Sequence, residues 1–282
     1  MIVDCHSHIW DCPGHMTPEF VAEANARSRG KPLDLHAPPE RHFKAMQNVD
    51  KAIVFGMRAF HSGQSVPNEY IADYVRSHPN KIIGFAAVDP TRDNVHETLE
   101  HGIQDLKLKG VKIGPIYQNI HPTDPRMLEV YAFCEKHNLP IMIHQGTTFL
   151  TRAPLKFSLP ILLEDVALQF PKLKMIIAHM GHPWIDETIV LIRKQPHFFA
   201  DISALHYRPW QFYNALISAK EYGVLDKLLF GTDYPFTTAE ATFESLRNFN
   251  QMAAGTNLPK LAQEEIEQLI HSPTLELLEL AS

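Results

Sequence analysis

The stretch PRMLEVYAFCEKHNLPIMIH, from Pro125 to His144, contains a helix pattern followed directly by a strand pattern. Positions 128, 131, 132 and 135 recur at the spacing of one helix face, whereas Pro140–Ile143 is a continuous apolar run. Pro125 suits the first turn of a helix, and Asn138 suits its C-terminal stop. An apolar run without alternation is typical of a parallel strand that is buried on both faces. The stretch therefore predicts a helix and then a buried parallel strand.

The same unit recurs along the whole chain. Eight short apolar runs are found at Ile2–Cys5, Ala52–Met57, Ile82–Val88, Gly110–Ile113, Pro140–Ile143, Lys174–Ala178, Phe198–Ile202 and Lys227–Phe230. A helical pattern follows each run, and after the first interval the spacing is nearly even. Eight strand–helix units of similar size predict an α/β fold, the (β/α)8 TIM barrel. A doubly wound parallel sheet is the alternative, since it has the same order of elements.

The first interval is longer than the others and predicts an insertion after strand 1. Residues 11–38 are rich in proline, glycine and charged side chains, so we expect a lid or an oligomer contact. At the other end, Gln263–Leu280 predicts one or two extra helices, interrupted at Pro273. No linker divides the chain, and we expect a single domain over residues 1–282.

Composition and charge exclude several classes of protein. The 282 residues are 45% hydrophobic and 21% charged, with a formal net charge of −6. This balance argues against a nucleic-acid partner, and no apolar run is long enough to span a membrane. The N-terminus lacks the features of a signal peptide, and the three cysteines are too dispersed for a disulfide framework. We expect a cytoplasmic protein, for which the sequence leaves a monomer or a homodimer open.

Histidine occurs 17 times, and several histidines end predicted strands. The first, fifth, sixth and eighth strands end in imidazoles or a carboxylate: His6, His8, His144, His179 and Asp233. Because the active site of a TIM barrel lies at the C-terminal ends of its strands, these side chains are expected to converge. They are ligand types that suit a borderline cation such as zinc.

Side-chain parity refines this hypothesis at the first strand. His6 and His8 are two residues apart and therefore share one face of the strand, so two neutral imidazoles can bind the same ion. Asp4 shares that face by the same argument. We therefore expect Asp4 to orient the imidazoles from behind.

In chain order, the segments that carry these residues resemble the amidohydrolase superfamily. The resemblance rests on Asp4-Cys5-His6-Ser7-His8, Gly110-Val111-Lys112-Ile113, Ile143-His144, Ala178-His179-Met180-Gly181 and Gly231-Thr232-Asp233-Tyr234-Pro235. Within the superfamily, the sequence is similar to the amidohydrolase-related group that includes 2-amino-3-carboxymuconate-6-semialdehyde decarboxylase. The resemblance implies one divalent metal ion, usually zinc, with the ligands His6, His8, His144 and Asp233. It also implies that His179 is a catalytic acid or base.

These implied roles predict an enzyme. A divalent cation lowers the pKa of bound water from ~15.7 to about 7, which favours a metal-dependent hydrolase. Asp233 would then be both a ligand and a proton acceptor, while His179 donates a proton or stabilises an oxyanion. A non-oxidative decarboxylase with the same site is the main alternative, and a non-catalytic barrel is a third. Lys112 leaves another alternative open, because superfamily members with two metal ions often bridge them through a carboxylated lysine.

The predicted loops after the strands also contain candidate substrate contacts. Arg58, Arg152 and Arg208 could hold a carboxylate, since guanidinium groups bind carboxylates through two hydrogen bonds. His182 is expected to line the same pocket. Flat apolar side chains also occur in these loops: Trp10, Phe60, Tyr117, Phe149, Trp184, Tyr207 and Phe236. We expect a small, anionic, cyclic substrate with at least one carboxylate, such as a lactone or an amide.

Overall fold

Eight parallel strands form the centre of the molecule in the computed structural model, which describes residues 1–26 and 34–280. The barrel strands are β1 (Val3–His8), β2 (Lys51–Phe55), β5 (Ile82–Gly84) with β6 (Ala86–Ala87), β7 (Val111–Ile113), β8 (Ile141–Ile143), β9 (Met175–Ile177), β10 (Phe198–Asp201) and β11 (Leu228–Leu229). β5 and β6 are two pieces of one strand, interrupted only at Phe85. Each apolar run of the sequence coincides with one of these strands, so the eight strand predictions are confirmed.

Backbone hydrogen bonds close this sheet into a barrel. One part has the order β1-β2-β5 and the other runs from β6 to β11, so the interrupted strand joins them. At the remaining edge, the Cys5 amide donates to the Phe230 carbonyl over 2.9 Å. The His8 amide donates to the Tyr234 carbonyl, also over 2.9 Å. The fold is therefore a (β/α)8 barrel, and the doubly wound sheet is excluded.

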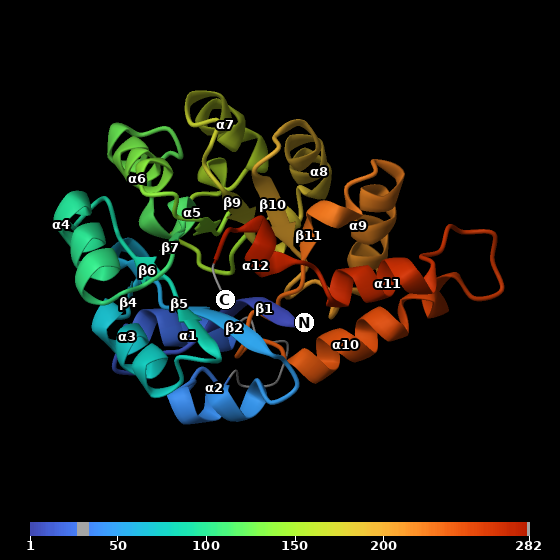
Figure 1. Ribbon diagram of the computed structural model, residues 1–282, viewed down its shortest axis with the longest axis horizontal. Coiled ribbons are helices and arrows are strands. Elements are labelled where there is room, and N and C mark those ends of the chain that lie inside the picture. The colour runs from blue at the N-terminus through green and yellow to red at the C-terminus, as the bar shows by residue number, and fades with distance from the viewer. Residues whose placement is uncertain (27–33, 281–282) are drawn as a thin grey trace.

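Helices surround the barrel, as Figure 1 shows. Their bounds are α1 (Pro18–Ala26), α2 (Pro39–Ala45), α3 (Asn68–Ser77), α4 (Val95–Glu100), α5 (Pro115–Gln118), α6 (Pro125–Lys136), α7 (Glu164–Gln169), α8 (Ile185–Lys194), α9 (Pro209–Glu221), α10 (Ala239–Arg247), α11 (Gln263–Ile270) and α12 (Thr274–Leu277). A two-stranded antiparallel hairpin, β3 (Arg58–Ala59) with β4 (Gln64–Ser65), follows β2 and was not predicted. Its strands are too short to give a sequence pattern.

Local sequence signals explain where helix α6 begins and ends. Pro125 is its first residue, and the Asp124 side chain accepts a hydrogen bond from the Arg126 amide before the first full turn. Asn138 follows the helix with φ of 54°, in the left-handed region where asparagine is tolerated best after glycine. The helix-to-strand unit from Pro125 to His144 is thus present as predicted.

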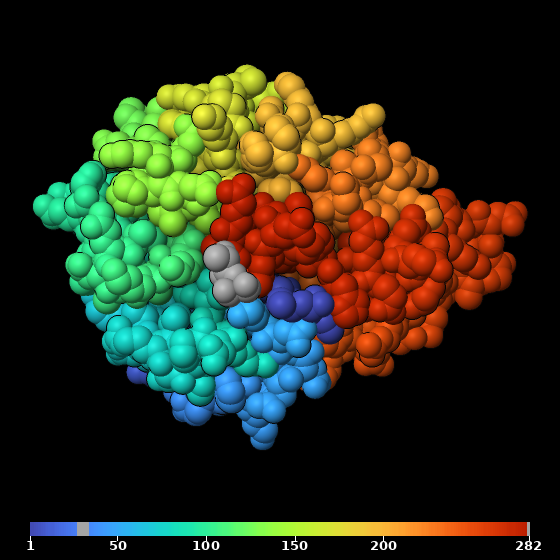
Figure 2. Space-filling model, viewed as in Figure 1, coloured from blue at the N-terminus to red at the C-terminus, as the bar shows by residue number. Residues whose placement is uncertain are grey.

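The barrel interior forms its own apolar cluster, separate from the larger cluster between strands and helices. Its buried residues are Cys5, Ile53, Phe55, Phe85, Met142, Ile176, Ala178, Phe199, Leu229, Leu278 and Leu280. The last two come from the C-terminal segment around α12, which lies at the centre of the barrel in Figure 1. Figure 2 shows the same segment, in red, covering the middle of this face beside the N-terminus. The predicted extra C-terminal helices are confirmed as α11 and α12, and the segment around α12 covers the N-terminal end of the barrel.

The insertion after β1 lies beside loops at the other end of the barrel. Residues 27–33 of the predicted insertion, 11–38, fall outside the described residues. The Thr17 amide donates to the Gly63 carbonyl in the loop after β2 over 2.9 Å. Thr151, in the loop after β8, donates to the Glu23 carboxylate of α1 through its amide and its hydroxyl. The insertion therefore links loops that follow two separated barrel strands.

No helix among the described residues has both the length and the apolar character needed to cross a membrane.

Candidate metal centre

Three side-chain atoms converge at the C-terminal end of the barrel. Nε2 of His6 lies 3.3 Å from Nε2 of His8, and each of these nitrogens lies 3.3 Å from Oδ1 of Asp233. The two histidines come from β1, and Asp233 comes from the turn after β11, the strand that closes the barrel against β1. All three residues are buried. The structure thus brings together three of the four metal ligands expected from the sequence.

The other ring nitrogens of the two histidines show which way their lone pairs point. Nδ1 of His6 is 2.8 Å from the Asp201 carboxylate, and Nδ1 of His8 is 3.2 Å from the Phe55 carbonyl. Both partners can only accept, so Nδ1 is the protonated nitrogen when each ring is neutral. The lone pairs are therefore on Nε2, and they face each other and the Asp233 carboxylate.

This triangle fits a metal ion well. Three acceptors 3.3 Å apart repel one another unless positive charge lies among them. Ligand atoms about 2.0–2.1 Å from a tetrahedral ion are separated by about 3.3 Å, which is the spacing seen here. Two imidazoles and a carboxylate are also common ligands of zinc and similar divalent ions. The donor set, its spacing and its burial therefore agree with a divalent cation site.

His144, the fourth expected ligand, lies beside this triangle. It follows β8, its ring is 5.3 Å from the ring of His179, and it is buried. Nε2 of His144 donates to the Thr147 carbonyl over 3.1 Å, so the lone pair of the neutral ring is on Nδ1. Burial lowers the pKa of His144 well below its usual value, which keeps the ring neutral. The residue can thus offer a nitrogen lone pair from the third strand of the site.

His179 faces the same triangle from the end of β9. A ring nitrogen of His179 lies within 4.8 Å of the ligand atoms of His6 and Asp233, and its ring stacks on His6 at 4.8 Å. Its Nδ1 is 2.8 Å from the Ser203 hydroxyl. Burial lowers the pKa of His179, although the Asp233 carboxylate opposes this shift. These distances allow both a role in proton transfer and a role as a ligand.

The backbone at these strand ends adopts conformations that ordinary residues rarely use. φ is 53° at His179, 49° at Met180 and 61° at Asp233. Left-handed conformations of this kind cost non-glycine residues of order 1–3 kcal/mol and often mark functional sites. At Asp233 the amide donates to the His6 carbonyl over 2.7 Å, which ties the carboxylate-bearing turn to β1. Gly231 permits this close approach, because a Cβ there would lie 3.1 Å from Cβ of His6.

Asp201 is a buried carboxylate that the sequence analysis did not include. It ends β10, and its Oδ2 accepts from Nδ1 of His6 over 2.8 Å. Burial would raise the pKa of Asp201, but the charge of His6 and the hydrogen bond to it lower the pKa overall. One signal could have revealed it, since a lone carboxylate at the end of an apolar strand needs a buried partner.

The prediction that Asp4 orients the imidazoles is wrong. The Asp4 carboxylate accepts from the amides of His6 and Thr232 and from the Thr232 hydroxyl. The His6 ring is bound by Asp201 instead, whose Oδ2 lies 2.8 Å from Nδ1 of His6. The pairing of β1 with β2 shifts between Asp4 and Ser7, and such an irregularity breaks the simple alternation of side chains. Parity along β1 was therefore not a reliable guide at this point.

Lys112 lies inside the barrel, below the convergent side chains. It is buried on β7, and its Nζ lies 4.8 Å from the centre of the Phe55 ring. Burial lowers the pKa of Lys112 to about 8, although the carboxylates of Asp201 and Asp233 oppose this shift. The amine is close enough to both carboxylates to feel their charge.

Two of the three candidate arginines have other partners. Arg58 donates two hydrogen bonds to the Asp93 carboxylate, over 2.9 and 2.6 Å. The edge of its guanidinium that would hold a substrate carboxylate is therefore engaged. Arg152 is exposed, and its Nη1 donates to the His61 carbonyl over 3.2 Å. Neither contact places the guanidinium at the metal centre.

Arg208 is better placed for a substrate. Its Nη1 donates to the Ala204 carbonyl over 3.1 Å, and Ala204 follows Ser203, the residue that holds His179. Burial lowers the pKa of His182 to about 4, and the charges of Arg208 and His179 contribute to this shift. Arg208 therefore lies near the loop that connects the metal centre with the molecular surface.

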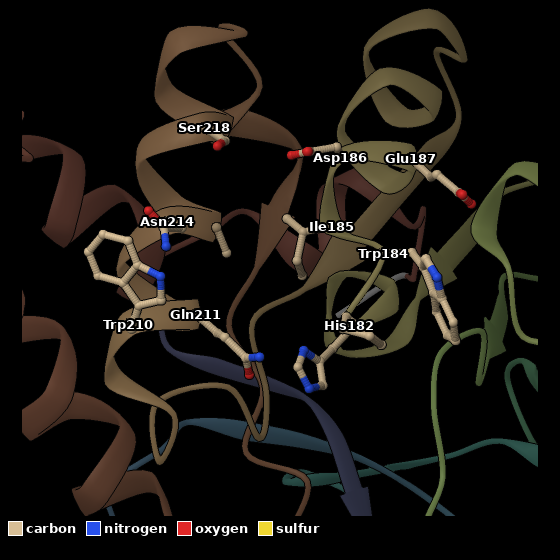
Figure 3. Close-up of a pocket in the computed structure, with 11 residues that line it drawn as sticks. His182, Trp184, Ile185, Asp186, Glu187, Trp210, Gln211, Asn214 and Ser218 are labelled. Carbon is tan, nitrogen blue, oxygen red and sulfur yellow. The ribbon is translucent and has the colours of Figure 1, made fainter.

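His182 lies at the inner end of a groove between α8 and α9. The groove has a volume of about 540 Å³, and Figure 3 shows His182 and Gln211 at one end with Ser218 at the other. Nδ1 of His182 is buried and has no hydrogen-bond partner in the described part of the chain. His182 was expected to line the pocket, and in the structure it lines this groove, close enough to His179 and Arg208 to feel their charges.

Aromatic rings form further walls around the site. The Trp10 ring stacks on His8 with centres 4.8 Å apart, and its indole nitrogen donates to the Leu35 carbonyl in the insertion. The Tyr117 ring lies 4.5 Å from the ring of His144. These contacts give the metal centre flat, apolar neighbours, as expected for part of the aromatic set.

Comparisons with known proteins agree with this arrangement. The sequence model of the amidohydrolase family matches residues 3–279. An uncharacterised TIM-barrel protein from Bordetella bronchiseptica is similar in structure, with a TM-score of 0.77, 21% identity, and coverage of 99% of this chain and 98% of the other. A probable 2-pyrone-4,6-dicarboxylic acid hydrolase from Acinetobacter baumannii gives a TM-score of 0.67 at 17% identity, over 99% of both chains.

A third similar structure is a decarboxylase. A dihydroxybenzoic acid decarboxylase from Polaromonas sp., with bound manganese and an inhibitor, gives a TM-score of 0.66 at 15% identity. That match covers 99% of this chain and 97% of the other. At such identities the structural matches support the barrel fold alone, whereas the sequence match covers nearly every residue. The chain therefore belongs to the amidohydrolase family.

Proposed function

We propose that the protein is a metal-dependent hydrolase with one divalent ion, most simply zinc, at the C-terminal end of its barrel. The observation that carries this proposal is the triangle of three lone-pair acceptors, 3.3 Å apart, from His6, His8 and Asp233. His144 would complete the ligand set through Nδ1. When bound, such an ion polarises a substrate carbonyl and makes water a better nucleophile.

The remaining steps can be assigned to the protein's own side chains. Oδ2 of Asp233, the oxygen that is outside the triangle, can accept a proton from the attacking water. His179 can take up a proton at Nε2 and pass it to the leaving group, or hold the oxyanion once protonated, because its ring lies beside His6 and Asp233. The surroundings suit these tasks, since the neighbouring imidazoles, His179 most of all, lower the pKa of Asp233 well below its usual value despite its burial. Asp233 is therefore ionised and ready to accept a proton at neutral pH.

The proposed substrate is a small cyclic molecule that bears a carboxylate. Arg208 donates to the Ala204 carbonyl, next to the Ser203 that contacts His179, and could bind the carboxylate. Trp10 and Tyr117 flank the metal ligands with flat rings that suit a planar substrate. Arg58 and Arg152 are weaker candidates, because Arg58 is paired with Asp93 and Arg152 is exposed. A lactone with a carboxylate substituent satisfies these features.

Metal analysis followed by a substrate screen in ¹⁸O-enriched water tests this proposal. We expect one divalent ion per chain, and turnover of lactones or amides with ¹⁸O in the product. Release of CO₂ from aromatic carboxylates without solvent oxygen in the product would instead assign a decarboxylase. Two ions per chain, with a carboxylated Lys112, would overturn the single-metal site. The His101→Gln variant is a suitable control for metal content, because His101 is an exposed histidine that pairs with Glu69 and Asp105 away from the site.

A further inference from the structure

Asp201 contacts both histidines that the proposed reaction uses, and its two oxygens serve different partners. Oδ2 accepts from Nδ1 of His6 over 2.8 Å. Oδ1 accepts from the amides of His179 and Ser203, each over 3.0 Å, and from the Ser203 hydroxyl. The carboxylate is fully buried at the end of β10. One side chain therefore links a metal ligand from β1 to the turn that carries His179 after β9.

The hydrogen bonds around Asp201 also determine proton positions on both rings. Because Asp201 can only accept, the proton of the neutral His6 ring must lie on Nδ1, which leaves the Nε2 lone pair for an ion. The Ser203 hydroxyl donates to Asp201, so it can only accept from Nδ1 of His179, 2.8 Å away. The Ser203 carbonyl, 3.2 Å from the same nitrogen, requires the same proton position. Both imidazoles thus present Nε2 without a proton.

We propose that Asp201 is a positioning residue that fixes the His6 imidazole with Nδ1 protonated and, through its other oxygen, holds the backbone turn of His179. The consequence for metal binding rests on the proposed function, whereas the proton position on His6 does not. The backbone amides of His179 and Ser203 cannot change from donor to acceptor. They therefore anchor Oδ1 and leave Oδ2 to the His6 ring.

This asymmetry makes Asp201→Asn a directed test. The amide oxygen of asparagine must face the two backbone N–H groups, so its NH₂ group must face Nδ1 of His6. The ring can satisfy that donor only if Nδ1 accepts, and the proton then moves to Nε2. Nε2–H would point at the position of the ion, where it cannot be a ligand. The substitution keeps the shape of the side chain and reverses a single hydrogen bond at the ring.

Asp4 provides a matched control on the neighbouring strand. It is another fully buried carboxylate, and it accepts from the backbone amides of His6 and Thr232 through Oδ1. Its Oδ2 accepts from the Thr232 hydroxyl instead of a ring nitrogen. A hydroxyl can rotate and accept from an amide NH₂ group, so Asp4→Asn leaves the His6 ring unchanged. The two variants differ only in which partner must reverse its role.

The test combines ¹⁵N NMR of the imidazoles in the metal-free protein with Zn²⁺ competition against a chromophoric chelator. In alkaline buffer, where the rings are neutral, we expect His6 of the unsubstituted protein to carry its proton on Nδ1. Asp201→Asn should move that proton to Nε2 and weaken Zn²⁺ binding by about 10–100-fold, as loss of such supporting contacts does. Asp4→Asn should change neither quantity.

Two outcomes would overturn the inference. One is a proton on Nε2 of His6 in the unsubstituted protein, a measurement that does not require any variant to fold. The other is a result in the variants: the proton of His6 stays on Nδ1 in Asp201→Asn, or Asp201→Asn and Asp4→Asn lose Zn²⁺ affinity equally. If the unsubstituted protein binds no divalent ion, the proposed function fails, but the NMR result still decides what Asp201 does to His6.

Discussion

At the N-terminal end of the barrel, Leu278 and Leu280 close the interior with apolar contacts, whereas at the C-terminal end the strands finish in imidazoles and carboxylates. The first end has a helix, α12, packed against the strands. The second has left-handed turns at His179 and Asp233 and three acceptors with no proton among them. One end therefore stabilises the fold, whereas the other end holds backbone strain and facing lone pairs, and a cation would relieve the repulsion among those lone pairs.

The difference implies that function and stability can be changed separately. Burial of apolar surface supplies most of the favourable free energy of folding, and the apolar clusters lie in and around the barrel wall. The metal centre contributes little to those clusters, although its residues are buried. Substitutions at the two ends should thus affect different measurements, and any substitution that changes both would show that the ends are coupled.

The largest expected effect is loss of the metal by His6→Ala. The variant removes one corner of the triangle and the ring that Asp201 orients, so the ion should be lost and activity with it. The fold should remain, because the ligands lie at the rim and outside the packed interior layers. Metal content and circular dichroism of the purified variant check this prediction. Unfolding of the variant would show that the rim is part of the structural core.

The next effect is a large fall in kcat for His179→Asn with the metal retained. Positioned proton transfer typically contributes about 10²–10⁴-fold to rate, so kcat should fall by that factor with a smaller change in KM. Because the pKa of His179 is lowered, the limb of the pH–rate profile that His179 sets should lie at a lower pH than for an ordinary histidine. That limb should be absent in the variant. An empty metal site in His179→Asn would make His179 a ligand instead.

At the opposite end, Leu278→Ala should lower stability without changing metal binding. Leu278 is fully buried in the barrel-interior cluster, and truncation of such a side chain costs about 2–5 kcal/mol. Urea unfolding measures the loss, and chelator competition measures the metal affinity. Leu258→Ala is the control, since Leu258 is 43% exposed and its truncation should change stability by about 0.5 kcal/mol or less. A parallel fall in metal affinity would contradict the separation of the two ends.

The sequence predicted the periodic parts of this molecule better than the contacts that cross it. Apolar runs and helix patterns gave all eight strands, because each strand is buried on both faces and has its own local signal. Strand ends such as His144 and Asp233 could be grouped, since parallel strands bring their C-terminal ends together. Local pattern was insufficient for Asp201, which is 195 residues from its partner His6, and for Asp4, where the shift in pairing of β1 breaks the parity rule.

The arginines show the same limit, since spacing placed Arg58 and Arg208 in equivalent loops but their partners differ. Asp93 holds the Nε–Nη2 edge of the Arg58 guanidinium, so a substrate would have to compete with a partly buried ion pair. Nη1 of Arg208 donates to the Ala204 carbonyl, and the guanidinium stacks on Tyr207 with its Cζ 4.5 Å from the ring centre. The two residues are therefore expected to respond differently to the same substitution.

The smallest expected effect is a rise in KM for Arg208→Met. A hydrogen bond to a charged group contributes about 1.5 kcal/mol at the lower end, which corresponds to about a tenfold rise in KM with kcat little changed. Arg58→Met is the matched comparison, and it should lower stability through the loss of the Asp93 pair while KM stays constant. Steady-state kinetics with the substrate found in the screen, together with thermal unfolding, measure both. If Arg58→Met raises KM and Arg208→Met does not, the carboxylate of the substrate binds on the side of the mouth near β3 and displaces Asp93.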